Sequence, residues 1–241
     1  MEENKLKKEK IENLFCKISQ CDKCKYIRNK NGIDSSLINI FKNEKLYKNI
    51  PSIWTDWYRR LDSKIMIIGQ DWGPYIEMKK IHEKYMKNPN TENWNNIIEE
   101  EKSITKKMLT KYLIKSSDKA GIKINEKFLN NIYITNGILC ARKGESYRGD
   151  NINLKKSSLN CKDYLKEQID IIKPKIILTL GYYPLFELSN IYNFSIGKTL
   201  KENIDKEIRV DNFVILPLYH PAAQVSEEKQ LNCYLKIWKY Y

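Results

Sequence analysis

The feature that most constrains this chain is a set of short apolar runs, each followed by polar residues. Residues 64–69 (KIMIIG) form a continuous apolar run typical of a strand buried on both faces, and 131–135 (NIYIT) and 175–181 (KIILTLG) predict two more strands. Residues 164–172 have a helical pattern that stops before a proline. Because strands alternate with helices, we expect an α/β sandwich with a parallel-centred sheet.

The remaining segments predict helices and one hairpin. Residues 206–220 read as a hairpin that turns at Asp211 and Asn212, and residues 5–19 and 226–240 as helices. The stretch 78–116 is polar and helix-prone, with a break at NPNTENW. The segment 31–60 is irregular, and we expect its aromatic side chains to pack on the core: Trp54, Trp57 and Tyr58.

Polar side chains follow the predicted strands. Gln70 and Asp71 come after the first strand, Asn136 after the second and His220 after the hairpin. In open α/β sheets the site lies beyond the carboxyl ends of the strands, so these side chains are expected to converge on one crevice. A strand-end carboxylate alone is usually a turn former or a helix cap; three such positions together favour a functional site.

Composition narrows the class of protein. Lys and Arg number 43 against 30 Asp and Glu, a net charge of +13, which favours phosphate-bearing partners; a lysine-rich proteome with solvated basic surfaces would explain the same balance. No stretch approaches the roughly 18 apolar residues needed to cross a bilayer, and the charged N-terminus has no apolar signal region. We therefore expect an intracellular, cytoplasmic protein.

Four of the six cysteines fall into two pairs that are distant in sequence. Cys21 and Cys24 have the spacing C-x2-C, and Cys140 precedes Cys161 by 21 positions. In a reducing compartment such thiolates can hold zinc or an iron–sulfur cluster, and the spacing alone does not choose between them. Cys140 alone would read as a small buried hydrophobe. The other two thiols lie within helical patterns and are interpreted as core or surface thiols: Cys16 and Cys233.

Taken in order, these motifs resemble the uracil-DNA glycosylase superfamily, closest to its family 4 type. The motifs are KIMIIGQDWGP, NIYITNGILC, the C-x20-C spacing, YLKEQIDIIKPKIILTLG and VILPLYHPAA. The resemblance covers about residues 14–30, 62–75 and 108–240. It implies a three-layer α/β/α sandwich with a central, mainly parallel four-stranded sheet. We interpret residues 1–241 as a single domain of this kind, with an N-terminal cluster-binding segment (about 1–30) and a helical insert (about 76–107).

The resemblance also implies a cofactor and its ligands. Family 4 carries a 4Fe–4S cluster that looks structural, and zinc is the less favoured alternative. The implied ligands are Cys21, Cys24, Cys140 and Cys161.

The chain departs from the family 4 pattern at the first turn. Gln70 stands where family 4 has Glu, and Asp71 where it has Ala; Gln-Asp is what family 1 enzymes have there, and their Asp acts on water. The loop with a Phe that stacks on uracil is replaced by the insert at 76–107. The final motif is His-Pro-Ala where family 4 has His-Pro-Ser.

The chemistry of N-glycosidic cleavage assigns roles to these residues. The transition state resembles an oxocarbenium ion with a departing base anion. Asp71 is expected to stabilise the sugar and accept a proton from water, and His220 to donate to O2 of the base. Asn136 reads the pyrimidine edge, accepting from N3–H and donating to O4, and the backbone of Gln70 contacts O2. The expected stacking ring is Tyr75, with Trp72 second.

Flipping a base out of DNA requires contacts around the site. Phosphate contacts are expected from Arg142, Lys143 and Arg148, although this run also reads as a solvated loop. Gln224 and Val225 are the expected wedge. The leading hypothesis is a monomeric glycosylase that removes uracil from DNA. The alternatives are a glycosylase for another, possibly bulky, modified pyrimidine, for example in phage DNA defence, and a catalytically inactive DNA-binding module.

Overall fold

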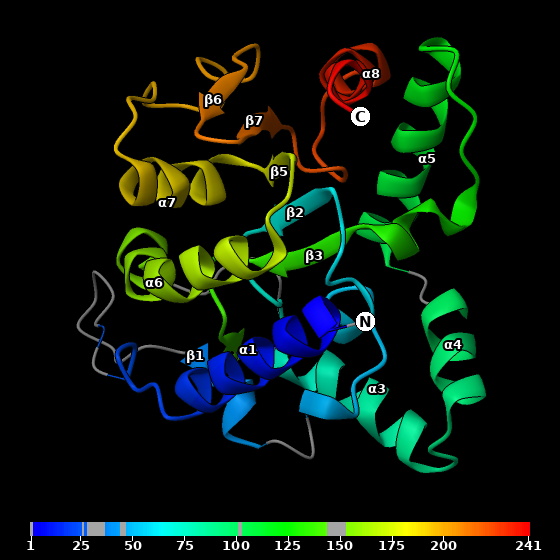
Figure 1. The fold of residues 1–241 in the computed structure, drawn as a ribbon, viewed down its shortest axis with the longest axis vertical. Helices are drawn as coiled ribbons and strands as arrows, with labels where there is room; N and C mark the ends of the chain where they lie inside the picture. The colour runs from blue at the N-terminus through cyan, green and yellow to red at the C-terminus, as the bar shows by residue number, and fades with distance from the viewer. Residues whose placement is uncertain (1, 26, 28–36, 44–46, 101–102, 144–152) are drawn as a thin grey trace.

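The core of the molecule is a five-stranded sheet in the order β3-β2-β5-β7-β6 (Figure 1). The computed structural model describes residues 2–25, 27, 37–43, 47–100, 103–143 and 153–241. Four strands are parallel and β6 runs antiparallel to β7 at one edge. The strands are β2 (Ile65–Gly69), β3 (Tyr133–Asn136), β5 (Ile176–Leu180), β6 (Ile208–Val210) and β7 (Phe213–Leu218).

The four parallel strands confirm the expected sheet, and the predicted hairpin adds the fifth strand. Val210 pairs with Phe213 across the predicted turn, where Asp211 has a φ of 44°. This left-handed conformation is one that Asp tolerates better than most residues.

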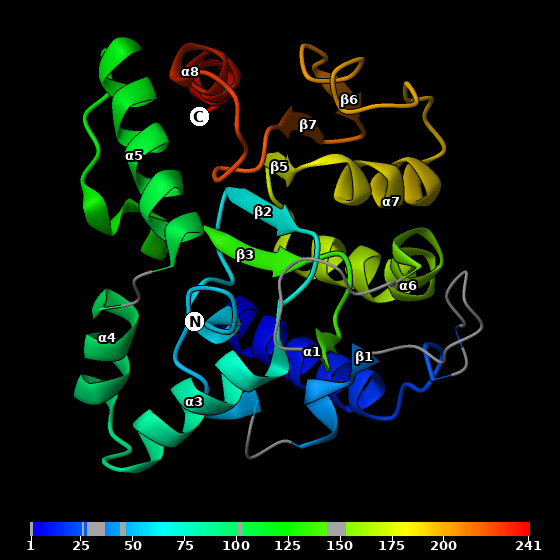
Figure 2. The same ribbon diagram turned by 180° about the vertical axis from the view of Figure 1, so that it is seen from behind.

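Helices cover both faces of the sheet, so the predicted three-layer sandwich is confirmed (Figures 1 and 2). The alternation along β2 shows the two faces: Ile68 belongs to the core beneath α1, α6 and α7, and Ile67 to the core beneath α5 and α8. The helices are α1 (Glu2–Ser19), α3 (Tyr75–Met86), α4 (Thr91–Glu100), α5 (Ile104–Lys119), α6 (Leu154–Ile172), α7 (Tyr182–Tyr192) and α8 (Glu227–Leu235).

Several helix boundaries follow from capping residues. The Ser103 and Asn153 side chains accept from backbone N–H groups in the first turns of α5 and α6. Helix α6 starts ten residues before its predicted start at 164 and ends at Ile172, followed by the C-cap Lys173, whose φ is 55°. None of the described helices is long and apolar enough to cross a membrane.

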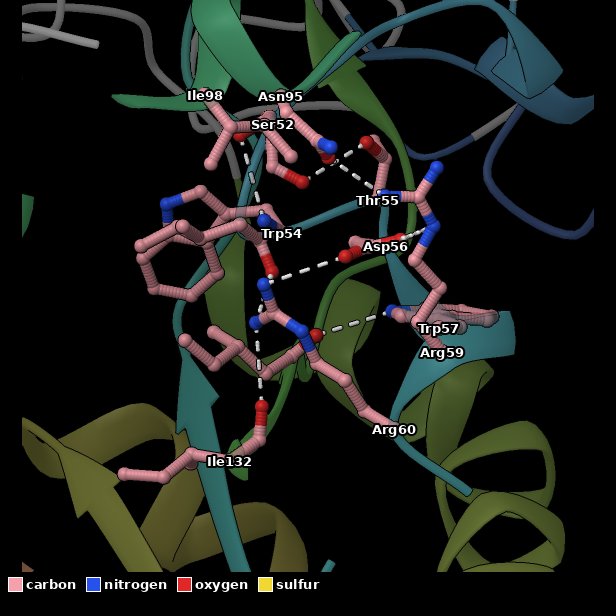
Figure 3. A network of polar contacts seen from close by, with 12 residues as sticks. Ser52, Trp54, Thr55, Asp56, Trp57, Arg59, Arg60, Asn95, Ile98 and Ile132 are labelled. Atoms are coloured by element: carbon pink, nitrogen blue, oxygen red, sulfur yellow. Dashed lines mark hydrogen bonds and ion pairs between the residues drawn. The ribbon is translucent and has the colours of Figure 1, made fainter. Parts of the chain in front are cut away.

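The free edge of β3 is covered by side chains rather than by another strand (Figure 3). The indole N–H of Trp57 donates to the Ile134 carbonyl at 3.0 Å, and Arg60 donates to the Ile132 carbonyl at 3.1 Å. These bonds satisfy edge carbonyls that would otherwise be open to another chain. Trp57 is also fully buried in the core, as predicted for this segment.

A small two-stranded ribbon lies beside the main sheet. Strand β1 (Leu37–Ile38) pairs antiparallel with β4 (Ala141–Arg142). Because β4 follows Cys140 and β1 follows the Cys21–Cys24 region in sequence, the ribbon draws the two cysteine pairs toward one part of the molecule.

Candidate active site and cysteine cavity

The catalytic residues expected from the sequence lie at the carboxyl ends of parallel strands. Gln70 and Asp71 follow β2, Asn136 ends β3 and His220 follows β7. The loop after β3 stays bonded to the turn after β2: Gly137 N–H donates to the Gly69 carbonyl and Ile138 N–H to the Gln70 carbonyl, both at 2.9 Å. The backbone therefore holds the turn after β2 and the end of β3, where Asn136 lies, in fixed register.

The Asp71 carboxylate is fully engaged. Its Oδ1 accepts from Gly73 N–H at 2.8 Å and from Arg142 Nε at 3.1 Å. Its Oδ2 accepts from Gln70 Nε2 at 2.8 Å and from an Arg142 terminal nitrogen at 2.7 Å. A carboxylate offers about four lone-pair positions, so these four donors fill it.

Arg142 reaches Asp71 from strand β4. The two side chains are 11% and 5% exposed, and the contact is bidentate, the stronger form of this ion pair. Arg142 N–H also donates to the Gly73 carbonyl at 2.9 Å. The guanidinium expected to reach a DNA phosphate therefore lies against the turn that follows β2. The next residue, Lys143, is exposed, and Arg148 lies outside the described residues.

Asn136 is 1% exposed, and among the described residues neither polar atom of its amide has a hydrogen-bond partner. Leaving a buried amide unpaired is unfavourable, so this side chain points to a ligand that supplies both bonds. Gly69 makes room for it, because a Cβ there would lie 2.4 Å from Asn136 Oδ1. The same Cβ would lie 2.9 Å from Cζ3 of Trp54. Sequence analysis placed Trp54 in the core, and only the fold brings it to this position.

His220 is held in one orientation and one tautomer. Its Nδ1 accepts from Ala222 N–H at 3.2 Å, which leaves the hydrogen of the neutral ring on Nε2. Its carbonyl accepts from the buried Gln230 side chain at 3.0 Å and from Ala223 N–H at 2.8 Å. The residue is exposed at the surface, yet protein crowds one side of its ring. This desolvation lowers the pKa of His220 below its usual range, and the Asp71 charge partly offsets the shift.

The two rings expected to stack on the base are placed elsewhere. Trp72 packs against Phe41 and Trp57, with ring centroids 6.3 Å apart in each pair. Trp72 and Tyr75 both pack against the core beneath α1, α6 and α7. Side chains alternate between the two faces along β3, so Asn136 lies on the same face as Ile134. This is the face that α5 and α8 cover. The structure does not bring these two rings to the base-reading amide.

The expected wedge lies in the turn between His220 and α8. Gln224 is exposed and Val225 is half-buried. Val225 N–H donates to the Ala223 carbonyl at 2.9 Å, which makes the turn tight. Ser226 then caps α8 by accepting from Lys229 N–H.

Glu187 on α7 is a buried carboxyl that sequence analysis did not single out. It is fully buried, and neither oxygen has a hydrogen-bond partner in the part of the chain that the structure describes. Burial raises its pKa well above the usual range, so the group is held neutral. A Cβ at Gly137 would lie 2.3 Å from its Oε2. A larger residue at position 137 would therefore require the Glu187 carboxyl to move.

The four paired cysteines line one cavity of about 470 Å³, together with Tyr75, Asn39 and Lys42. Within the described part of the chain, no three His, Cys, Asp or Glu side chains are close enough to hold a single metal ion. A four-iron cluster is larger than one ion, and a cavity lined by four thiols is compatible with it.

The thiols also affect one another electrostatically. Burial raises the pKa of Cys140 to about 12, with further increases from Cys24 and Cys21. Burial likewise raises the pKa of Cys161 well above its usual range, and Cys140 adds to the shift. Thiols buried this close together favour a cationic partner that stabilises their thiolate forms. The donor set therefore fits an iron–sulfur cluster.

The sheet is mainly parallel, and its strand ends carry a paired carboxylate, a buried amide and an oriented neutral histidine. These features define an α/β protein with polar groups gathered at one edge of the sheet. The family model described as the uracil DNA glycosylase superfamily matches residues 56–241. The chain belongs to this superfamily.

Two curated relatives are similar over shorter stretches. The type-4 uracil-DNA glycosylase of Saccharolobus solfataricus is 40% identical over 68 residues, which cover 27% of this chain and 32% of the relative. The type-4 uracil-DNA glycosylase of Sulfurisphaera tokodaii is 38% identical over 66 residues, which cover 26% of this chain and 30% of the relative. The chain therefore spans about a third of the length of the curated relatives it matches.

Proposed function

We propose that this chain is a monofunctional DNA glycosylase that hydrolyses the N-glycosidic bond of uracil in DNA and leaves an abasic site. The observation that carries the proposal is the Asn136 amide, which is buried and unpaired beside a turn that holds a carboxylate. Membership of the superfamily and similarity to the two type-4 enzymes support the same reaction.

Base recognition falls to Asn136 and the turn after β2. The amide carbonyl accepts from N3–H of uracil and the amide nitrogen donates to O4, which cytosine cannot match in the same orientation. The backbone of Gln70 and Asp71 contacts O2. A pocket that leaves two buried polar atoms unpaired in the free protein discriminates strongly against bases that cannot pair with them.

His220 stabilises the leaving base. Its neutral ring donates Nε2–H toward O2 as negative charge develops there, in the manner of an oxyanion-hole donor. The lowered pKa keeps the ring neutral at physiological pH, and the bond from Ala222 holds the required tautomer.

Asp71 acts on the sugar side. As the C1′–N1 bond breaks, its charge stabilises the oxocarbenium character of C1′; the oxygen of a water then bonds to C1′ and a proton passes to the carboxylate. All four lone-pair positions of Asp71 are filled in the free protein. The Gln70 amide is the one neutral side-chain donor among them and the weaker side-chain partner. We assign Gln70 to move aside and admit the water, while Arg142 keeps the carboxylate in place.

The cluster, a 4Fe–4S group held by Cys21, Cys24, Cys140 and Cys161, would supply a structural cross-link. Cys140 lies two residues before Arg142, so anchoring Cys140 also anchors the strand that holds Asp71. In this proposal the cysteine site supports the catalytic turn through the chain's own backbone.

The remaining contacts are with DNA. Lys143 is exposed and suited to a phosphate, and Gln224 with Val225 forms the wedge that enters the base stack. The net charge of +13 favours the same partner. One chain supplies every proposed site residue, so we propose that it acts as a monomer.

A second candidate function is excision of another modified pyrimidine. Helix α3 follows the turn after β2 directly, at the place where family 4 has a short loop with the stacking Phe. This changes the wall of the pocket and, with it, the base that fits.

A panel of oligonucleotides tests both candidates. Each carries one uracil, thymine, cytosine or 5-hydroxymethylcytosine, in single- and double-stranded form, and abasic sites are revealed by alkaline cleavage. We expect cleavage at uracil that is lost in Asn136→Leu, a substitution of similar size without polar atoms. Cleavage only at a base other than uracil would establish the second candidate, and no cleavage by cluster-loaded protein would contradict both.

A further inference from the structure

The region around Gly69 joins three side chains that are far apart in sequence. A Cβ at this glycine would lie 2.4 Å from Asn136 Oδ1 and 2.9 and 3.0 Å from the Cζ3 and Cη2 atoms of Trp54. The edge of the indole ring and the base-reading amide therefore meet at one point above the end of β2. The glycine is what allows both to approach.

We propose that Trp54 is the aromatic wall of the base pocket and stacks on the flipped base. The inference rests on the proposed glycosylase function and names the residue that determines how the base is held. A base that pairs with the Asn136 amide must occupy the space beside that amide, and the ring already borders this space. Base and indole are then in contact, and stacking on a ring face is the favourable form of that contact.

Access to Asn136 also depends on this ring. The amide is 1% exposed, so a base reaches it only when a neighbouring group gives way. Trp54 is half-buried, whereas the residues directly before and after it, Ile53 and Thr55, are buried. Its ring is the part of this segment that can change rotamer at the surface while the backbone stays in place.

The backbone that carries Trp54 is tightly held (Figure 3). Arg60 donates to the Ile53 carbonyl and to the Ile132 carbonyl, each at 3.1 Å, so it links the residue before Trp54 to the strand that carries Asn136. Arg60 also pairs with Asp56 at 3.4 Å.

Side-chain caps complete this turn. Trp54 N–H donates to the Ser52 hydroxyl at 3.3 Å, and the Thr55 hydroxyl donates to the Ser52 carbonyl at 3.2 Å and to the Ile50 carbonyl. A ring delivered from a rigid support is pre-organised for binding, as a stacking wall requires.

This placement explains how the chain manages without the family's stacking loop. The rings in the turn itself, Trp72 and Tyr75, pack on the other face of the sheet. Trp54 belongs to the segment before β2 and reaches the pocket over the edge strand β3. In this chain the aromatic wall is therefore supplied by the segment before β2, whereas in family 4 it comes from the loop after that strand.

The test compares Trp54→Phe, which keeps a ring, with Trp54→Leu, which removes it. The control is Trp94→Leu, the same change in a tryptophan that packs edge-on against Tyr85 on the α3–α4 hairpin, with ring centroids 5.4 Å apart. We expect Trp54→Leu to lower kcat/KM on a uracil oligonucleotide by roughly 10- to 100-fold. Trp54→Phe should recover most of the loss, and Trp94→Leu should stay near wild type.

A binding measurement gives a readout besides activity. Tryptophan fluorescence is titrated with an oligonucleotide that carries 2′-fluoro-2′-deoxyuridine, whose glycosidic bond resists hydrolysis. We expect quenching in wild type and Trp94→Leu that is largely lost in Trp54→Phe, because the quenched indole is gone while binding persists.

The outcomes distinguish failure of the role proposed for Trp54 from failure of the proposed glycosylase function. If wild type cleaves uracil and Trp54→Leu cleaves with unchanged kcat and KM and unchanged quenching by the analogue, the role of Trp54 is refuted and the function stands. If wild type neither cleaves uracil nor binds the analogue, the proposed function fails at its own step.

Discussion

The Arg142–Asp71 pair makes a prediction that separates a positioning role from a DNA contact. Arg142→Ala removes two of the four donors to the Asp71 carboxylate and leaves it with Gly73 N–H and Gln70. Because the two side chains are 11% and 5% exposed, the carboxylate that remains is nearly buried and loses its counter-charge. Both stability and activity should fall.

The magnitude follows from burial and geometry. Removing one partner of a buried ion pair typically costs about 3–5 kcal/mol of unfolding free energy. Two donors remain on Asp71, so we expect a value near the lower end, about 3 kcal/mol. In a double-mutant cycle with Asp71→Asn, the coupling energy should be about 1.5–3 kcal/mol, the range for hydrogen bonds to charged groups.

Urea unfolding of the four proteins in the cycle measures this coupling, with Arg209→Ala as the matched control. Arg209 is exposed on the edge strand β6, so its loss should change stability by no more than about 0.5 kcal/mol. A coupling energy below about 0.5 kcal/mol, with Arg142→Ala changing only KM and the salt dependence of binding, would refute the positioning role and restore the phosphate contact expected from the sequence.

Three further predictions concern other polar groups. An NMR titration of the two histidines should place the pKa of His220 below 6.5. Asp71→Asn should lower this pKa further, because the Asp71 charge raises it. Activity should fall as pH drops through this pKa, and a His220 pKa above 6.5 would contradict the proposed role. Asn136→Asp should move the preference from uracil toward cytosine, because an acceptor replaces the donor that faces position 4; excision rates on matched oligonucleotides measure the change. Glu187→Gln should gain stability relative to wild type as pH rises above the usual pKa of 4.5, by up to about 1.4 kcal/mol per pH unit. Folded wild type keeps the Glu187 proton that the unfolded chain releases, so its stability falls with pH; parallel stability curves from chemical unfolding would contradict this.

Much of the fold could be predicted because local pattern and tertiary structure agree. The runs that end at Gly69 and Asn136 are buried on both faces, and their neighbours in the sheet are the strands that the alternation predicts. The turn residues at 211 and 212 identify the hairpin directly. Helix α6 was predicted too short, because its first turns contain few apolar residues and depend on the Asn153 cap.

The site could be predicted at its strand ends but not in the contacts that complete it. A strand-end position is a property of local sequence, so Asp71, Asn136 and His220 were identifiable. The partner of Asp71 comes from β4, and the ring beside Asn136 comes from the segment before β2. Arg142 and Trp54 reach the site through long-range packing, which periodicity does not encode.

The arrangement also gives a physical reason for the spacing of Cys140 and Arg142. Ala141 and Arg142 form β4, which pairs with β1 and carries the guanidinium to the catalytic turn. A ligand site at Cys140 restrains the same short strand. Backbone continuity through β4 therefore links the cysteine cavity to the candidate active site.

The measurement that tests the central claim most directly is mass-spectrometric detection of the free base released from a uracil-containing oligonucleotide. The protein is purified anaerobically with its cluster, and the Asp71→Asn and His220→Ala double variant is the control. The account predicts stoichiometric free uracil and an intact abasic strand from wild type, and at most a trace from the variant. No free uracil from wild type, or equal release by the double variant, would contradict it.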